Sequence, residues 1–325
     1  MRYWLLTVTL ALLQIGCSSY AQKTETYENR TKAERKPFQK RNLDLKSPES
    51  YSKRELENGK EYDHKPTVKL LDERAGNYEF SWIGYDKKKK SVIYQREDSV
   101  EAVVEAKIEK DSEGTLTYKY LVKNLVDSPT YLHGFVVQTI APDVQTTKSD
   151  AVFIGEMSNF IKEYKEGVWK DFVVREETSP RINQGQSIEF SLTSKDLPGV
   201  VGCRASGGQG YTIGVGEHMP SELDRIVPVN LWAKGYTIGP IASLSKMNKS
   251  ERTRYLLESL PTFVEAGWMS EDTSKIYRAI LEREDLAGAL EQSKKDLDKE
   301  YVTNEVFQII EGLNLYDNRE IPFNR

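Results

Sequence analysis

The sequence contains few of the residues that bind metals or form disulfide bonds. Its 325 residues include two cysteines and three histidines. Two cysteines cannot form a disulfide scaffold, nor a zinc site built from several thiolates. The histidines are His64, His133 and His218, and their spacing matches no zinc-binding motif. We therefore expect neither a metal ion nor another cofactor.

A large excess of charge of one sign is also absent. The chain has 46 basic and 50 acidic residues, and its formal net charge is −4. Proteins that bind nucleic acids usually carry a basic surface that neutralises phosphates. Because the overall composition offers no such excess, we expect no nucleic-acid partner.

The sequence also lacks an apolar run that would span a bilayer comfortably. Its most apolar segment, residues 3–16, has 14 residues, whereas a membrane-spanning helix needs about 20. This segment follows Arg2 and precedes small residues that end at Ala21. A basic part, an apolar part and a small-residue part in this order are typical of a secretory signal peptide. We predict a signal peptide at residues 1–21 and a location outside the cytoplasm, in the periplasm, at the cell surface or in the medium.

Two ways of processing this signal peptide remain open. Cleavage after Ala21 would release a soluble chain that begins at Gln22. Alternatively, Gly16-Cys17 resembles the end of a bacterial lipobox, although Gln14 stands where lipoproteins usually carry leucine. In that form Cys17 is acylated, and its lipid is the only expected contact with a membrane.

Residues 22–67 combine many charges of both signs with scattered large apolar side chains. These apolar residues keep neither the helical nor the strand period. Such a segment buries too little surface to offset an ordering entropy of about 1–2 kcal/mol per residue. We therefore expect residues 22–67 to form a disordered, charged tether that links an envelope surface to the folded body.

Residues 68–245 show the pattern of antiparallel β structure. From Val100 to Ile108, apolar and charged residues alternate as in a half-buried strand. Turn-forming residues at 111–114 separate this run from a second alternating run at residues 115–123, which predicts a hairpin. More strand-like runs follow with short connections and without long helices between them. We therefore expect a mainly β fold, an antiparallel β-sandwich of the immunoglobulin or jelly-roll kind.

Residues 246–325 change to the helical period. Asn248 and Glu251 fit a capping box at a helix start, and Gly267 suits a helix end. A second amphipathic helix is expected to run from Ser270 to about Leu290, and a third is expected around residues 302–313. Together they predict a small C-terminal helical domain.

The most unusual segment runs from Gly207 to His218. Its glycines permit positive φ angles or a close approach of the backbone to another group. Their spacing fits neither a dinucleotide-binding nor a phosphate-binding loop. The segment is either a mobile loop between strands or a loop that contacts a ligand. The candidate ligand-contacting residues are Gly207, Gly208, Gln209, Gly210, Glu217 and His218.

No pair of a nucleophile and a base stands out. Cys203 lies within an apolar strand and is expected to be buried and inert. We therefore predict no catalytic residue and an exported binding or structural module whose partner is a protein or glycan at the cell envelope. The alternative is an exported hydrolase that acts on polysaccharide or cell-wall material, with its site near the loop of residues 207–218.

Overall fold

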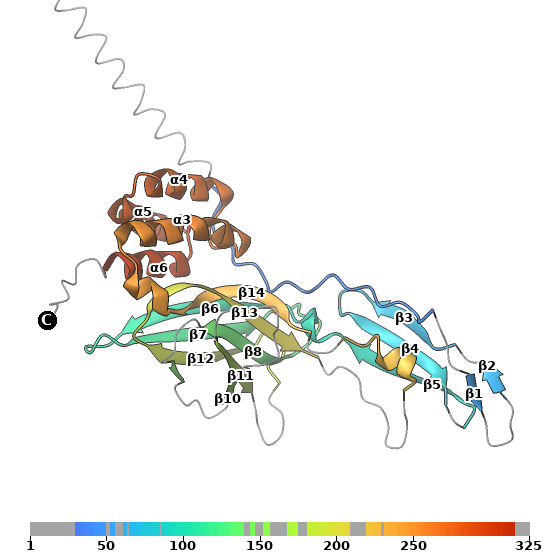
Figure 1. The fold of residues 1–325 in the computed structure, drawn as a ribbon. Coiled ribbons are helices and arrows are strands. Elements are labelled where there is room, and N and C mark those ends of the chain that lie inside the picture. Colours follow the sequence, from blue (N-terminus) through green and yellow to red (C-terminus); the bar gives the residue numbers. More distant parts are fainter. Residues whose placement is uncertain are drawn as a thin grey trace, which may run out of the picture. The chain divides into compact units, whose positions relative to one another are not determined.

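The protein folds into two compact units (Figure 1). The β unit comprises residues 36–247, and the helical unit combines residues 1–35 with residues 248–325. No helix in the described part of the chain is both long and apolar enough to cross a membrane. The predicted signal peptide, with Cys17, lies outside the described residues and stays a prediction. The computed structural model describes residues 30–49, 53–55, 61–63, 65–84, 86–139, 144–146, 152–156, 168–174, 181–208, 219–228 and 231–315.

The strands of the β unit are paired antiparallel throughout its described part. The first sheet has the order β10(Val152–Glu156), β11(Val168–Val174), β8(Leu132–Thr139), β13(Leu197–Gly207), β14(Ala233–Ile241). The second has the order β6(Ala102–Lys110), β7(Leu116–Asn124), β12(Ser187–Ser194), β9(Gln145–Thr146). The third has the order β3(Thr67–Asp72), β4(Asn77–Ile83), β5(Lys89–Gln95), and a separate pair joins β1(Lys53–Glu55) to β2(Glu61–Asp63).

The predicted hairpin is present as β6 and β7, which pair in register from Ala102↔Asn124 to Lys110↔Leu116. Alternate residues of β6 are buried, as the alternation in the sequence predicts. In the turn, the Asp111 carboxylate accepts hydrogen bonds from the backbone N–H groups of Glu113 and Thr115 at 2.9 and 2.8 Å. The side chain of a turn residue thus adds to the backbone hydrogen bond from Asp111 to Thr115 where the chain reverses.

Aromatic rings connect the first sheet to the second. The Phe135 ring of β8 stacks on Phe190 of β12 with centroids 5.7 Å apart, and it also lies against Tyr120 of β7. The Phe38 ring packs edge-on against the Phe135 ring, with centroids 6.3 Å apart. The backbone beside Phe38 pairs with both sheets, because Phe38 donates to Ala102 of β6 and Gln39 pairs with Lys234 of β14.

The third sheet has its own core. One face of β4 and β5 packs around α2(Ser221–Asp224) and residues of the N-terminal segment. The buried members of this cluster are Leu45, Tyr78, Phe80, Trp82, Tyr94 and Leu223. Leu71 and Ile93, on the strands of this sheet, are about half exposed (47% and 49%), so the sheet is covered on one face only.

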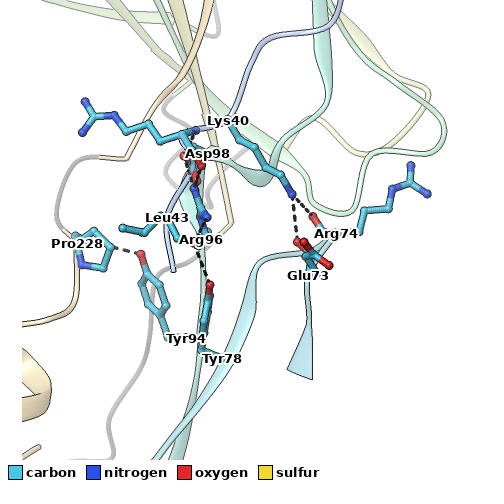
Figure 2. A network of polar contacts seen from close by, with 10 residues as sticks. Lys40, Leu43, Glu73, Arg74, Tyr78, Tyr94, Arg96, Asp98 and Pro228 are labelled. Atoms are coloured by element: carbon cyan, nitrogen blue, oxygen red, sulfur yellow. Dashed lines mark hydrogen bonds and ion pairs between the residues drawn. The ribbon is translucent and has the colours of Figure 1, made fainter. Parts of the chain in front are cut away.

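A buried ion pair joins the start of the chain to the third sheet (Figure 2). The Arg96 guanidinium donates two hydrogen bonds of 2.9 Å to the Asp98 carboxylate, which also accepts from the Arg41 backbone N–H. Arg96 donates further to the carbonyl oxygens of Arg41 and Leu43. Asp98 lies in the short 3₁₀ helix η1(Glu97–Ser99) and is fully buried. The network fixes the path of residues 41–43.

Some described residues of the predicted tether pack on folded parts of the chain, whereas most residues of 31–40 are exposed and have no helix or strand, as the tether prediction expects. Phe38 and Leu45 are buried, and Arg30 is 7% exposed. These apolar and charged side chains follow no local period, because each packs separately against a distant part of the chain. The short strands β1 and β2 also fall within the predicted tether.

The helical unit contains four described helices, one more than expected: α3(Lys249–Glu265), α4(Glu271–Leu281), α5(Leu286–Asp298), α6(Asn304–Leu315). The predicted capping box of Asn248 and Glu251 is present. The single helix predicted from Ser270 to about Leu290 is wrong. It is divided into α4 and α5, because Glu284 has a positive φ of 55° and Asp285 caps α5 by accepting from the Gly288 N–H. The loops before α4 and α6 are joined by a bridge between Met269 and Val302.

The chain is therefore mainly antiparallel β structure followed by C-terminal helices, which confirms the predicted class at this level. The sequence places the domain boundary between residues 245 and 246, and the division between the β unit and the helical unit falls two residues later, after Met247.

Candidate binding site at the base of the glycine-rich loop

The structure describes the start of the glycine-rich loop. Gly207 is the last residue of β13, and Gly208 follows it. The other four candidate residues, Gln209, Gly210, Glu217 and His218, lie outside the described residues. Their role as ligand contacts stays a prediction. The distances and contacts given below are those of the base of the loop, at Gly207 and Gly208.

Two features require glycine at this base. The pairing of β13 with β8 shifts register between Ser206 and Gly207, so Gly207 lies against the chain just before β8. A Cβ atom on Gly207 would overlap the carbonyl oxygen of Tyr131. Gly208 has a φ of +73°, which favours glycine. The predicted need for backbone freedom therefore holds at these two positions.

Tyr131 holds the loop at its base. Its phenolic hydroxyl donates a 2.8 Å hydrogen bond to the carbonyl oxygen of Gly208. The ring is positioned by its chain neighbour Leu132, which exchanges backbone hydrogen bonds of 2.9 and 3.0 Å with Ile182. The Asn124 side-chain amide donates to the carbonyl oxygens of both Thr130 and Ile182. The base is thus tied to two neighbouring segments.

The same bridge brings Arg181 onto Tyr131. The guanidinium carbon lies 4.5 Å from the centre of the Tyr131 ring, a distance typical of a cation–π contact. Arg181 is exposed, and it makes no ion pair with a carboxylate of the described residues. A planar cation supported by an aromatic ring can bind a carboxylate or another anionic group of a ligand.

The ring of His133 lies beside that of Tyr131, with ring centroids 6.3 Å apart. Burial lowers the pKa of His133, and the positive charge of Arg181 lowers that pKa further. The imidazole is therefore neutral at neutral pH. Burial also raises the pKa of Tyr131, and burial raises that of Glu97 nearby in η1. These shifts disfavour charge on the three groups.

Cys203 is fully enclosed in β13, four residues before the loop. It is 1% exposed and forms no disulfide, and burial raises its pKa well above the ordinary value for a thiol. The thiolate needed for nucleophilic attack is therefore suppressed. The expectation of a buried cysteine is confirmed. Among the described residues there is also no group of three acidic, histidine or cysteine side chains that could hold a metal.

Arg181, Tyr131 and the contact between Trp232 and Gly134 could not be predicted from the sequence. A Cβ on Gly134 would lie 3.0 Å from the Trp232 indole, which shows that the ring packs directly on the β8 backbone. No local pattern identifies these contacts, since their members are separated by 50 or more residues in the sequence.

Comparisons with known proteins give likenesses of fold only. No family model matches the sequence, and no curated protein matches it. One similar solved structure is an uncharacterized protein from Nocardia farcinica described as having an immunoglobulin-like fold. It is 12% identical, its TM-score is 0.27, and the match covers 43% of this chain and 97% of that chain. Another is a cohesin module from a Clostridium perfringens family 33 glycoside hydrolase, with 9% identity, a TM-score of 0.25 and coverage of 45% and 96%.

Proposed function

We propose that the protein is an exported binding module without catalytic activity, in which the loop of residues 207–218 contacts the ligand. The observation that carries this proposal is the fixed base of the loop. Tyr131 holds the Gly208 carbonyl, and Gly207 packs on the Tyr131 backbone. A loop fixed at its base loses less conformational entropy when its residues close on a ligand.

The chemistry around the base supports binding rather than catalysis. His133 is held neutral by burial, and the Cys203 thiol is enclosed. Arg181 is the exposed charge beside the loop, and its guanidinium suits a carboxylate. The ligand class that follows is a protein or glycan of the cell envelope that presents an acidic group.

The scaffold in this proposal is an immunoglobulin-like sandwich built from the first and second sheets. Its support is the stacking of Phe135 from β8 on Phe190 from β12, together with the contact of Phe135 with Tyr120 from β7. Rings of two sheets in contact are the usual filling of such a fold. A sandwich presents its loops at its ends, where they are available to a partner.

Export is part of the proposal and has its own test. Intact-mass measurement of the native product should give either a chain that begins at Gln22 or one that begins at an acylated Cys17. A mature product that retains Met1 would contradict export. A diacyl mass increment on Cys17 would select the lipid-anchored form over the soluble one.

The binding role is tested with the mature chain on a glycan array and on immobilised envelope fractions. Arg181→Ala should weaken retention roughly ten- to hundred-fold, since a charge-assisted contact contributes roughly 1.5–3 kcal/mol. Lys195→Ala, which removes an exposed charge just before the other end of β13, is the matched control and should leave retention unchanged. Hydrolysis of an array glycan that is lost in Glu217→Ala or His218→Ala would establish the hydrolase instead.

A further inference from the structure

The helical unit holds a short N-terminal segment, residues 30–35, through two buried carboxylates. The Arg30 guanidinium donates to both Asp296 oxygens at 3.0 and 2.5 Å, and the side chains are 1% and 0% exposed. The Arg35 guanidinium donates to both Glu305 oxygens at 3.1 and 2.9 Å, and the Glu305 side chain is 1% exposed. Each arginine therefore makes a two-pronged pair with an acid that lies in the interior of the unit.

Further contacts fix the segment between these arginines. The Ala33 N–H donates to the Glu300 carbonyl oxygen at 2.8 Å. The Arg30 guanidinium also lies 4.2 Å from the centre of the Tyr301 ring. Lys32 pairs with the Glu300 carboxylate, but both side chains are exposed, so this pair contributes little.

The acids belong to a rigid corner of the unit. Asp296 is in the last turn of α5, and Glu305 is in the first turn of α6. Gln292 also donates a 2.9 Å hydrogen bond to Asp296, so the carboxylate is held from its own helix as well as by Arg30. A buried carboxylate without a cation is strongly unfavourable, so this corner selects a segment that brings positive charge. The two-pronged geometry favours arginine over lysine.

We propose that the α5–α6 corner is a recognition site for an extended peptide that carries arginines five residues apart, and that residues 30–35 of the same chain occupy it. The described contacts of the segment with the helices join distant parts of the sequence, because Arg30 and Asp296 are 266 positions apart. It has no helix or strand of its own. It is therefore a ligand in cis rather than an element of the helical bundle. This inference does not depend on the proposed function.

The test cuts the segment away after folding. A protease recognition sequence is inserted between Lys36 and Pro37, both exposed, in the full mature chain. After cleavage, a fluorescent peptide of residues 28–36 is added, and its anisotropy reports binding. The expected result is that the peptide exchanges with the cut fragment and binds saturably. A peptide with Arg30→Ala and Arg35→Ala should bind at least ten-fold more weakly.

A matched pair of protein variants separates this site from general charge attraction. Asp296→Asn should weaken the peptide at least ten-fold, whereas Glu300→Gln, which removes the exposed acid, should change binding less than three-fold. Equal losses in both variants would overturn the proposal. So would a helical unit that stays folded by circular dichroism after cleavage but binds no peptide at 1 mM.

A second measurement covers the case in which the cut protein unfolds. Hydrogen exchange of the uncut chain is followed at Ala33, whose N–H is bonded in the site. Excess peptide should speed this exchange by displacing the tethered segment. The peptide is needed at millimolar concentration, because the tethered segment itself has an effective concentration in the millimolar range. The wild-type peptide and the peptide with Arg30→Ala and Arg35→Ala are compared. If neither changes the exchange rate at Ala33, the segment is a permanent part of the fold and the proposal is refuted.

Discussion

The ring of Phe38 occupies the space that a side chain on Gly235 would need. An ideal Cβ on Gly235 would lie 2.5 Å from the Phe38 Cδ1 atom. Gly235 is in β14, at the edge of the first sheet, and Phe38 belongs to a segment without a strand of its own. Because Gly235 has no side chain, the ring of Phe38, 197 positions earlier in the sequence, can pack on its backbone.

Phe38→Ala should destabilise the β unit by about 3–5 kcal/mol, since it removes a buried ring and leaves a cavity. The free energy of unfolding can be measured with urea and tryptophan fluorescence. Phe38→Leu is the control, and its loss should be clearly smaller. A loss below about 1 kcal/mol for the alanine variant would mean that Phe38 is not packed as described.

Gly235→Ala should destabilise the same unit by about 1–3 kcal/mol, because its added methyl group collides with the Phe38 ring. Combining it with Phe38→Ala should cost less than the sum of the single losses. Strict additivity in this double-mutant cycle would argue against direct contact.

Asp98→Ala should cost about 3–5 kcal/mol, because it leaves the buried Arg96 guanidinium without its counter-charge. Both side chains are at most 5% exposed. Asp86→Ala removes an exposed partner of Lys90 and serves as the control, which should change little. Similar urea midpoints for the two variants would contradict the role given to Asp98.

His133 should make the protein less stable as the pH falls. Its folded pKa is lowered by burial and by Arg181, so the unfolded chain binds more protons below the ordinary pKa of about 6.5. The contribution is fully present above that pH and is lost as the pH falls through the folded pKa.

The decrease in the free energy of unfolding between pH 7.5 and 5.5 should therefore be smaller in His133→Gln than in the wild type. Titration by NMR checks the cause, and assignment is simple with three histidines in the chain. Arg181→Ala should raise the pKa of His133. An unchanged pKa in that variant would show that the guanidinium charge does not reach the imidazole.

Cys203 should react slowly with a thiol reagent in the native protein and rapidly in urea. Burial both blocks access and raises its pKa, so the thiolate forms only when the strand opens. A colorimetric thiol assay follows the reaction. Fast labelling at neutral pH in the folded state would contradict the burial of Cys203.

The sequence predicted elements whose pattern is local. The hairpin of β6 and β7 follows from alternation and from the turn at Asp111, because each residue there faces either the core or the solvent. The start of α3 follows from Asn248 and Glu251, which bond each other within one turn. The division between α4 and α5 was missed because Glu284 in the left-handed region carries no glycine signal.

The sequence could not predict contacts between distant segments. Arg30 and Phe38 lie among charged residues that show no period, and their partners, Asp296 and Gly235, are far away in the chain. The same holds for the candidate site, where the glycines marked the loop but Arg181 and Tyr131 had no pattern around them. The composition of a segment indicates whether it can fold by itself. Whether it packs on another part of the chain depends on the residues of that other part.

The attachment of Arg30 to the helical unit limits how far the folded protein can stand from a surface. In the predicted form anchored through Cys17, 12 residues, 18–29, separate the lipid from Arg30. Fully extended, 12 residues reach about 40 Å, whereas a free segment of residues 22–67 would reach about 155 Å. A pulling force on the N-terminus would load the Arg30–Asp296 pair before the β unit.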